Sequence, residues 1–256
     1  MSVLNTFRLE GRVALVTGAS RGLGRAMAVA LAEAGADIAG LFRAGDGSET
    51  CAQVEALGRR FLPLAVDLLT ASAQDLRAAV AHVARAMGRL DILVNNAGEI
   101  RRAPALEFSE ADWDAVMQVN LKALFFLSQA AGEIMKAQGK GKIINMASML
   151  SFQGGILAPS YTASKSAVAG LTRALANEWA ALGINVNAIA PGYMATDNTI
   201  ALRNDPARYR SILERIPAQR WGTPDDLKGI AVFLASDASD YMHGAIVPVD
   251  GGWLAR

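Results

Sequence analysis

Seven short, almost continuously apolar runs alternate along this 256-residue chain with longer segments of helical period. The runs cover residues 12–19, 36–42, 60–66, 90–97, 141–148, 184–190 and 244–250. Because polar residues do not alternate with apolar ones in them, we expect strands buried on both faces, which is typical of a parallel sheet. Helices are expected near 22–34, 47–57, 72–87, 109–138, 159–181 and 225–235. Strand followed by helix, repeated, predicts an α/β fold: a doubly wound parallel sheet with helices on both faces.

The chain has no linker or low-complexity tract, so we expect residues 1–256 to form a single domain. One long segment, 191–224, contains four of the eight prolines, and we expect it to be irregular. A connection of that length in a compact domain is usually functional, often a lid over a binding site. A plain surface excursion is the alternative.

Composition narrows the class of protein further. Hydrophobic residues make up 52% and the net charge is only +1, which allows a large core and argues against nucleic acid as a partner. The single cysteine, Cys51, excludes an internal disulfide, and with two histidines we expect no metal site. No apolar run approaches the roughly 18 residues that cross a membrane, and the first residues lack the apolar core of a signal peptide. We therefore expect a soluble, cytoplasmic protein.

The stretch "TGASRGLG" places Gly18, Gly22 and Gly24 between the first strand and the first helix. Glycines there permit a tight turn and close approach of the backbone to a phosphate, which the helix N-terminus also attracts. The spacing is Gly-x-x-x-Gly-x-Gly and differs from the common Gly-x-Gly-x-x-Gly. Its position nevertheless predicts a dinucleotide site, with an ordinary loop as the alternative.

The end of the second strand bears on which dinucleotide binds. An acidic residue there holds the ribose 2′-hydroxyl of NAD, whereas an arginine accommodates the 2′-phosphate of NADP. Phe42 stands where the acid would be, Arg43 follows it, and Arg21 is a second cation within the glycine turn. Asp46, the nearest acid, comes late. These residues favour NADP, or a site that takes both NAD and NADP; two solvated arginines are the alternative.

The stretch "SYTASKSAVAG" places Tyr161 and Lys165 four residues apart, on one face of an expected helix. Ser148 lies at the end of the preceding strand, where open α/β sheets bind ligands. Such a group suits hydride transfer coupled to proton transfer at an alcohol or ketone. We expect the lysine ammonium and a positive nicotinamide to lower the tyrosine pKa from about 10, with Ser148 holding the substrate oxygen. A surface helix that carries both residues by chance is the alternative.

These motifs, in this order, resemble the short-chain dehydrogenase/reductase family over essentially the whole chain. The resemblance implies a Rossmann-type fold and an NAD(P)-dependent oxidoreductase. It implies four catalytic residues: Asn120, Ser148, Tyr161 and Lys165. Asn120, in "MQVNLKALFF", is similar to the family asparagine that anchors a water next to the lysine. Together with the glycine turn it implies a cofactor site made of Gly18, Ser20, Arg21, Gly22, Leu23, Gly24, Arg43, Asp67, Leu68, Asn95, Ala97, Gly98, Tyr161, Lys165, Pro191, Gly192, Met194 and Thr196.

Longer strings, such as "NNAGEIRRAPALEFSEADWD" and "APGYMATDNT", resemble family members that act on deoxy and keto sugar acids. Those members are usually described as NAD-linked, in conflict with Arg43. A sugar acid carries a carboxylate, for which an arginine is the natural partner. We expect Arg101 or Arg102 to bind it, and an ion pair with Glu99 or Glu107 is the alternative. Further substrate contacts are expected, on position, from Ser148, Met149, Gln153 and Tyr193.

Other functions remain open within this resemblance. One is reduction of 3-oxoacyl chains on a carrier protein, and another is oxidation of gluconate or a polyol. A nucleotide-binding regulator without catalysis is a third, although it would not need four reacting groups. The resemblance also implies a homotetramer that meets through the long helices 109–138 and 159–181, with Trp253 at a subunit contact. His82 is expected to be exposed, and His243 to lie near the C-terminal turn, with an approach of His243 to the site as the alternative.

Overall fold

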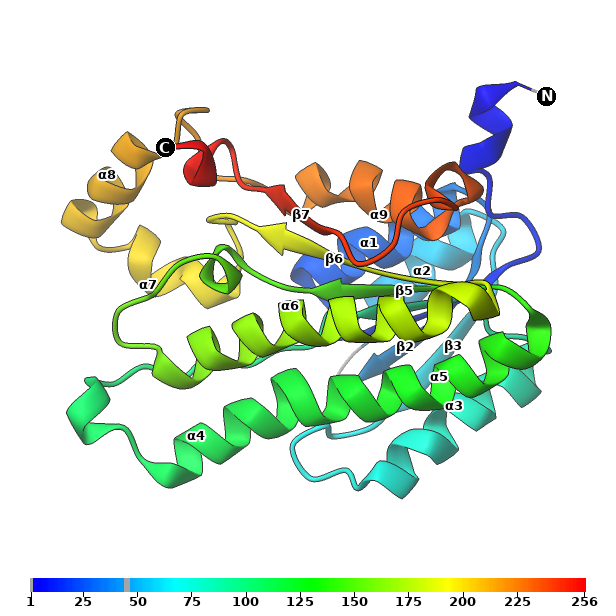
Figure 1. The fold of residues 1–256 in the computed structure, drawn as a ribbon. Helices are drawn as coiled ribbons and strands as arrows, with labels where there is room; N and C mark the ends of the chain where they lie inside the picture. The colour runs from blue at the N-terminus through cyan, green and yellow to red at the C-terminus, as the bar shows by residue number, and fades with distance from the viewer. Residues whose placement is uncertain (1, 44–46) are drawn as a thin grey trace.

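A single seven-stranded parallel sheet organises the computed structural model, which describes residues 2–43 and 47–256 (Figure 1). The strands are β1 (Val13–Thr17), β2 (Asp37–Phe42), β3 (Phe61–Ala65), β4 (Ile92–Asn95), β5 (Gly141–Met146), β6 (Ile184–Pro191) and β7 (Ile246–Val249). They lie in the order β3-β2-β1-β4-β5-β6-β7, so the chain reverses its winding between β1 and β4. The predicted doubly wound parallel sheet is confirmed.

Helices cover both faces of the sheet. On one face α1 (Gly22–Glu33) packs against α2 (Ser48–Ala56) and α9 (Lys228–Ala235). The other face carries α3 (Ala73–Met87), α4 (Glu110–Met117), α5 (Leu124–Gln138) and α6 (Pro159–Trp179), as Figure 1 shows. Every helix in the described part of the chain is too short or too polar to span a lipid bilayer.

The strand β1 shows why continuous apolar runs belong to a two-sided sheet. Val13 and Leu15 pack into the core beneath α3 and α5, whereas Ala14 and Val16 pack into the core beneath α1 and α9. The expectation of burial on both faces is wrong for β3 and β7, where of all residues only Leu64 is buried. Those two strands lie at the edges of the sheet, where a covering helix reaches only part of the surface.

The long helix expected over 109–138 is interrupted. A π-helical stretch, Gln118–Ala123, separates α4 from α5 and contains Asn120. π-Helical turns inside α-helices are rare and occur often at functional sites. Here the stretch lies where the Asn120 side chain bonds to the backbone of Glu99, in the loop after β4.

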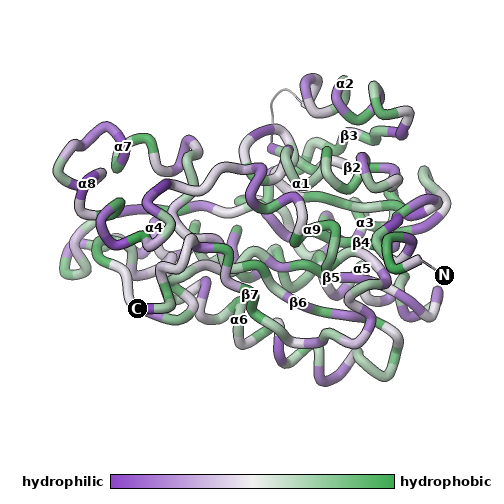
Figure 2. Tube along the Cα trace, turned by 90° about the horizontal axis from the view of Figure 1, so that it is seen from above, coloured by the Kyte–Doolittle hydropathy of each residue, from purple (hydrophilic) through white to green (hydrophobic). Residues whose placement is uncertain are grey.

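The expectation of an irregular segment 191–224 is wrong in part, because it contains α7 (Ile200–Arg203) and α8 (Pro206–Arg215). Pro206 starts α8 at a position where its missing N–H costs nothing. The side chain of Asp205 caps that helix by accepting hydrogen bonds from the backbone N–H groups of Ala207 and Arg208. Figures 1 and 2 show α7 and α8 extending past one end of the sheet.

Candidate active site

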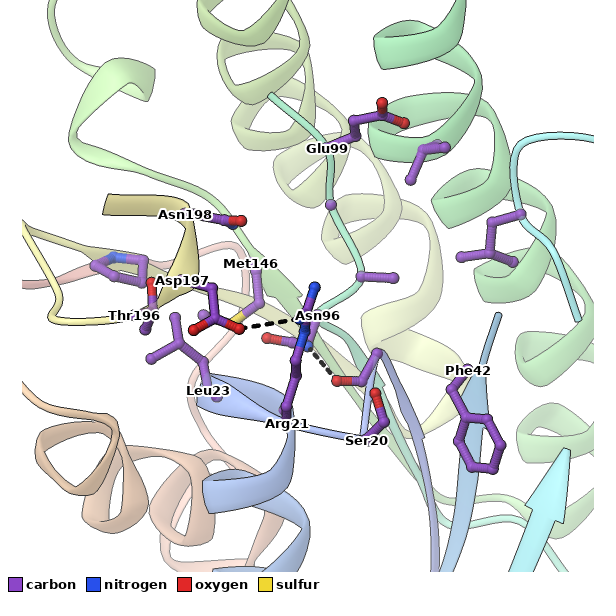
Figure 3. Close-up of a pocket in the computed structure, with 18 of the residues that line it drawn as sticks. Ser20, Arg21, Leu23, Phe42, Asn96, Glu99, Met146, Thr196, Asp197 and Asn198 are labelled. Atoms are coloured by element: carbon purple, nitrogen blue, oxygen red, sulfur yellow. Dashed lines mark hydrogen bonds and ion pairs between the residues drawn. The ribbon is translucent and has the colours of Figure 1, made fainter. Parts of the chain in front are cut away.

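A cleft of about 500 Å³ lies at the carboxyl ends of the strands, where the winding reverses (Figure 3). Parallel α/β sheets bind ligands at such a reversal. The glycine turn, the ends of β2, β4 and β5, and the segment after β6 all contribute to its walls. Of the expected cofactor residues, all except Asn95 line this cleft.

The glycine turn has the geometry that its residue types predict. Gly18 and Gly22 adopt φ angles of +66° and +56°, in the left-handed region that favours glycine. At Gly24 an added Cβ would lie 2.1 Å from the carbonyl oxygen of Gly18. The third glycine therefore lets α1 pack directly against the turn, with its N-terminus at the cleft.

Asn95 was expected in the cleft, and this expectation is wrong. Its buried side chain donates hydrogen bonds to Ser128 and Asn145, at 2.9 Å each, within the sheet and α5. The next residue, Asn96, lines the cleft and donates to the carbonyl oxygen of Thr17 at 2.8 Å. Successive side chains of a strand point to opposite sides, so this parity could have identified Asn96.

The four expected catalytic residues lie in or beside one part of the cleft. Ser148, Tyr161 and Lys165 line it. The buried Lys165 ammonium donates to the carbonyl oxygen of Met146 at 2.6 Å and lies 5.6 Å from the centroid of the Tyr161 ring. Asn120 is buried behind them and accepts from the backbone N–H of Glu99 at 2.7 Å.

The electrostatics of Tyr161 differ from the expectation. Loss of hydration raises the pKa of the Tyr161 phenol, and a hydrogen bond with Ser148 and the charge of Arg102 oppose that rise. The net direction is upward, so the residues of the protein do not by themselves lower this pKa. Burial also lowers the pKa of the Lys165 ammonium to about 8, because the charged form loses hydration.

The two arginines of "EIRR" have different environments. Arg101 pairs with Glu99 at 2.7 Å and with Asp112 at 2.6 Å, so the expectation of a substrate role is wrong for this residue. Arg102 is exposed, forms no ion pair with any described residue, and lies close enough to Tyr161 for its charge to lower the phenol pKa. Of the two candidates, only Arg102 has a guanidinium without an acidic partner among the described residues, and neither arginine lines the cleft.

Three expected substrate residues do not line the large cleft: Met149 and Gln153 contact the segment 191–224, and Tyr193 belongs to that segment. Met149 packs with Trp221 and Trp253 in a buried cluster beneath α8, and the Tyr193 ring lies edge-on to both tryptophans. Gln153 accepts a hydrogen bond from Arg215 at 3.3 Å. Trp253, expected at a subunit contact, is thus buried within its own chain.

The two histidines lie away from the cleft. His82 is exposed on α3, as expected. His243 precedes β7, at the amino ends of the strands, where its ring lies 3.2 Å from the Asn185 side chain. Proximity of His243 to the site is therefore excluded by the direction of the strands.

The cleft can accommodate a dinucleotide. A Cβ on Gly98 would fall 3.5 Å from Asn120 Oδ1 and 3.7 Å from Lys165 Nζ, so its absence keeps the cleft open beside the reacting groups. Arg43 lines the other end of the cleft. Arg21 pairs with Asp197 of the segment after β6 at 3.0 Å, across the mouth of the cleft (Figure 3). Asp46, the late acid, lies outside the described residues.

A family model described as Enoyl-(Acyl carrier protein) reductase matches residues 18–254. With the relatives below, this match shows that the chain belongs to the short-chain dehydrogenase/reductase family, and the protein is an NAD(P)-dependent oxidoreductase. It is 60% identical over 255 residues to 2-dehydro-3-deoxy-D-gluconate 5-dehydrogenase of Dickeya dadantii, covering 99% of this chain and 100% of the relative. The enzyme of that name from Escherichia coli is also 60% identical, with the same coverage.

Two solved structures extend the comparison. One, described as a 2-deoxy-D-gluconate 3-dehydrogenase from Agrobacterium tumefaciens with bound NADP, is 58% identical with a TM-score of 0.92, covering 98% of this chain and 100% of that one. A gluconate 5-dehydrogenase from Burkholderia cenocepacia, in complex with NADP and tartrate, is 41% identical with a TM-score of 0.95 over the whole of both chains.

The glycine turn leads to a prediction about Gly24. Replacing Gly24 with Ala places a methyl group against the Gly18 carbonyl, so we expect a loss of about 1–3 kcal/mol in the free energy of unfolding. We also expect weaker NADPH binding, because the turn and the start of α1 must separate. Urea denaturation and a fluorescence titration measure the two effects. Gly229→Ala is the control, since a Cβ there has nothing within 4 Å; equal behaviour of the two variants would contradict the prediction.

Proposed function

We propose that this protein interconverts a secondary alcohol and a ketone on a deoxy or keto sugar acid of the 2-dehydro-3-deoxy-D-gluconate or 2-deoxy-D-gluconate type. One observation carries the proposal: the charge of Arg102, an exposed guanidinium without an acidic partner among the described residues, acts on Tyr161, which lines the dinucleotide cleft. A substrate with a carboxylate a few bonds from its reacting carbon suits that pair. The names of the relatives at 60% identity support the same substrate class.

The proposed chemistry assigns one task to each residue at the reacting carbon. Tyr161 donates a proton to the ketone oxygen in reduction and removes it from the hydroxyl in oxidation. Ser148 hydrogen-bonds the same oxygen and holds it against the phenol. Because burial raises the pKa of Tyr161, its hydroxyl is protonated at neutral pH, which favours its role as the acid in reduction. Lys165, whose ammonium has a pKa of about 8, can supply the next proton, and Asn120 behind it would anchor the water that passes protons to the lysine.

The residues around the rest of the cleft suit the cofactor. When bound, the nicotinamide supplies or accepts the hydride. The glycine turn and the N-terminus of α1 would hold the pyrophosphate, and Pro191, Gly192 and Thr196 would hold the nicotinamide end. We propose a preference for NADP, since Arg43 directly follows β2, lines the cleft and forms no ion pair with any described residue. The NADP in the Agrobacterium and Burkholderia structures supports this preference.

The proposal includes a homotetramer in the cytoplasm. Phe125 and Phe126, in edge contact at 5.2 Å, are only partly buried on α5, and Trp113 on α4 is 40% exposed. Aromatic side chains that remain partly exposed on these two helices suit contact with a second copy. The cytoplasm holds the pool of nicotinamide dinucleotide that the reaction draws on.

A turnover panel tests the substrate. We expect the highest kcat/KM with 2-dehydro-3-deoxy-D-gluconate or 2-deoxy-D-gluconate, a lower value with gluconate, and the lowest with galactitol, which has no carboxylate for Arg102. Each compound is assayed with NAD and with NADP, and NADP is expected to give the higher value. Equal or faster turnover of galactitol, or of a 3-oxoacyl carrier-protein substrate, would replace the sugar-acid proposal with a polyol or acyl-chain enzyme.

The acid–base role of Tyr161 has its own signature. We expect Tyr161→Phe to lower kcat by about 10²- to 10⁴-fold while cofactor affinity changes little. In the parent, alcohol oxidation should increase with pH, because the raised pKa of Tyr161 leaves the base form scarce at neutral pH. That rising limb should be absent from the residual activity of the variant. If Tyr161→Phe turned substrate over as fast as the parent, Tyr161 would not be the acid–base group, and a different mechanism or a non-catalytic regulator would have to be considered.

The two arginines provide a matched pair of variants. We expect Arg102→Gln to raise KM for the sugar acid by about 10- to 100-fold, the equivalent of one charge-assisted hydrogen bond. KM for a neutral polyol should change little. Arg101→Gln is the control, because its guanidinium is already bound by Glu99 and Asp112. An equal rise in KM for the acid and the polyol would exclude carboxylate binding by Arg102.

A further inference from the structure

Two carbonyl groups of the glycine turn are held by side chains that do not line the cleft. Thr50 Oγ1 donates to the carbonyl oxygen of Ala19 at 2.8 Å. Arg25 donates to the carbonyl oxygen of Ser20 through both Nε, at 3.2 Å, and Nη2. Thr50 is completely buried and Arg25 is 22% exposed, so water competes little for these bonds.

The side chains that hold these carbonyls also hold one another. Arg25 Nε donates to Thr50 Oγ1 at 3.2 Å, and its guanidinium pairs with Glu49. Arg25 belongs to α1, whereas Glu49 and Thr50 belong to the first turn of α2. The cluster therefore joins the two helices that begin beside the dinucleotide cleft.

The geometry of the peptide bond determines what this cluster does to the turn. A peptide unit is planar and trans, so its N–H points opposite to its C=O. Holding the Ala19 carbonyl on the side of α2 turns the N–H of Ser20 the other way, and holding the Ser20 carbonyl does the same for the N–H of Arg21. Both residues line the cleft, and neither N–H has a hydrogen-bond partner among the described residues.

The preceding N–H groups of the turn are occupied. Those of Gly18 and Ala19 donate to the carbonyl oxygen of Leu41 on β2, at 2.7 and 3.4 Å. The N–H groups of Gly18 and Ala19 are therefore bonded to β2, whereas the cluster on α1 and α2 orients those of Ser20 and Arg21 toward the cleft. Two adjacent free N–H groups beside a helix N-terminus form an anion site.

We propose that Arg25 and Thr50 are positioning residues for the cofactor. They act through the backbone of the glycine turn and hold the N–H groups of Ser20 and Arg21 in the orientation that binds the phosphate of a dinucleotide. Without them the two peptide units are free to rotate, and the binding free energy must then cover the cost of ordering them. The inference depends on the NAD(P) dependence of the family and is independent of the sugar-acid proposal.

The experiment is a fluorescence titration with NADPH and with NADH, which needs no sugar substrate. We expect Arg25→Met and Thr50→Val each to raise the Kd by about three- to tenfold, the loss of one or two hydrogen bonds that order the turn. Thr50→Ser keeps the hydroxyl and should bind as tightly as the parent. In turnover assays KM for the cofactor should rise, whereas kcat at saturating cofactor should stay within about twofold of the parent, because neither side chain contacts the reacting carbon.

Arg12→Met is the matched control for stability. Arg12 is 16% exposed, donates to the carbonyl oxygen of Ala235 at 3.2 Å and pairs with Asp237, so it repeats the chemistry of Arg25 away from the cleft. Arg25→Met should bind NADPH more weakly than Arg12→Met, even where their urea midpoints agree. Equal Kd values for these two variants would overturn the proposal. If Arg25→Met does not fold, the threonine pair decides, and Thr50→Val with the Kd of the parent would also overturn it.

Discussion

The seven strands are parallel, so their carboxyl ends all lie on the same side of the sheet, and the whole candidate site depends on that constraint. The glycine turn leaves β1, Asn96 follows β4, Ser148 follows β5 and Gly192 follows β6. These residues are far apart in the chain, yet parallel pairing brings them to the walls of one cleft. Reversal of the winding between β1 and β4 separates the flanking helices there, which leaves space for a dinucleotide.

Desolvation is the second constraint, and it acts on the proposed acid–base group. Lys165 is buried and Tyr161 is half-buried, and loss of hydration raises the pKa of the phenol and lowers that of the ammonium to about 8. The two pKa shifts have one cause, because loss of hydration disfavours the charged form of each group. Their effect is to keep the proton on the tyrosine, where a carbonyl oxygen can receive it. Ser148 and Arg102 reduce this effect without reversing it.

Much of the architecture could be predicted, because a strand buried on both faces leaves a clear pattern of continuous apolar residues. The pattern failed at β3 and β7, since a run of apolar residues does not reveal that a strand lies at an edge. A second expectation, that the prolines make the segment 191–224 irregular, failed at Pro206, which begins α8 where a helix break was expected. Periodicity is a property of one segment of sequence. The position of a strand in the sheet and the start of a helix depend also on the other segments that pack against it.

The site shows the same division. The residue types of the glycine turn, and the spacing of Tyr161 and Lys165, are local properties, so the sequence by itself determined that a dinucleotide turn and a tyrosine–lysine pair exist. Only the tertiary structure decided that Asn96 faces the cleft in place of Asn95, and that acidic neighbours bind Arg101 whereas no acid in the described part of the chain pairs with Arg102. The physical reason is that the direction of a side chain and the partner of a charge depend on distances between segments remote in sequence. Those distances exist only once the sheet has formed.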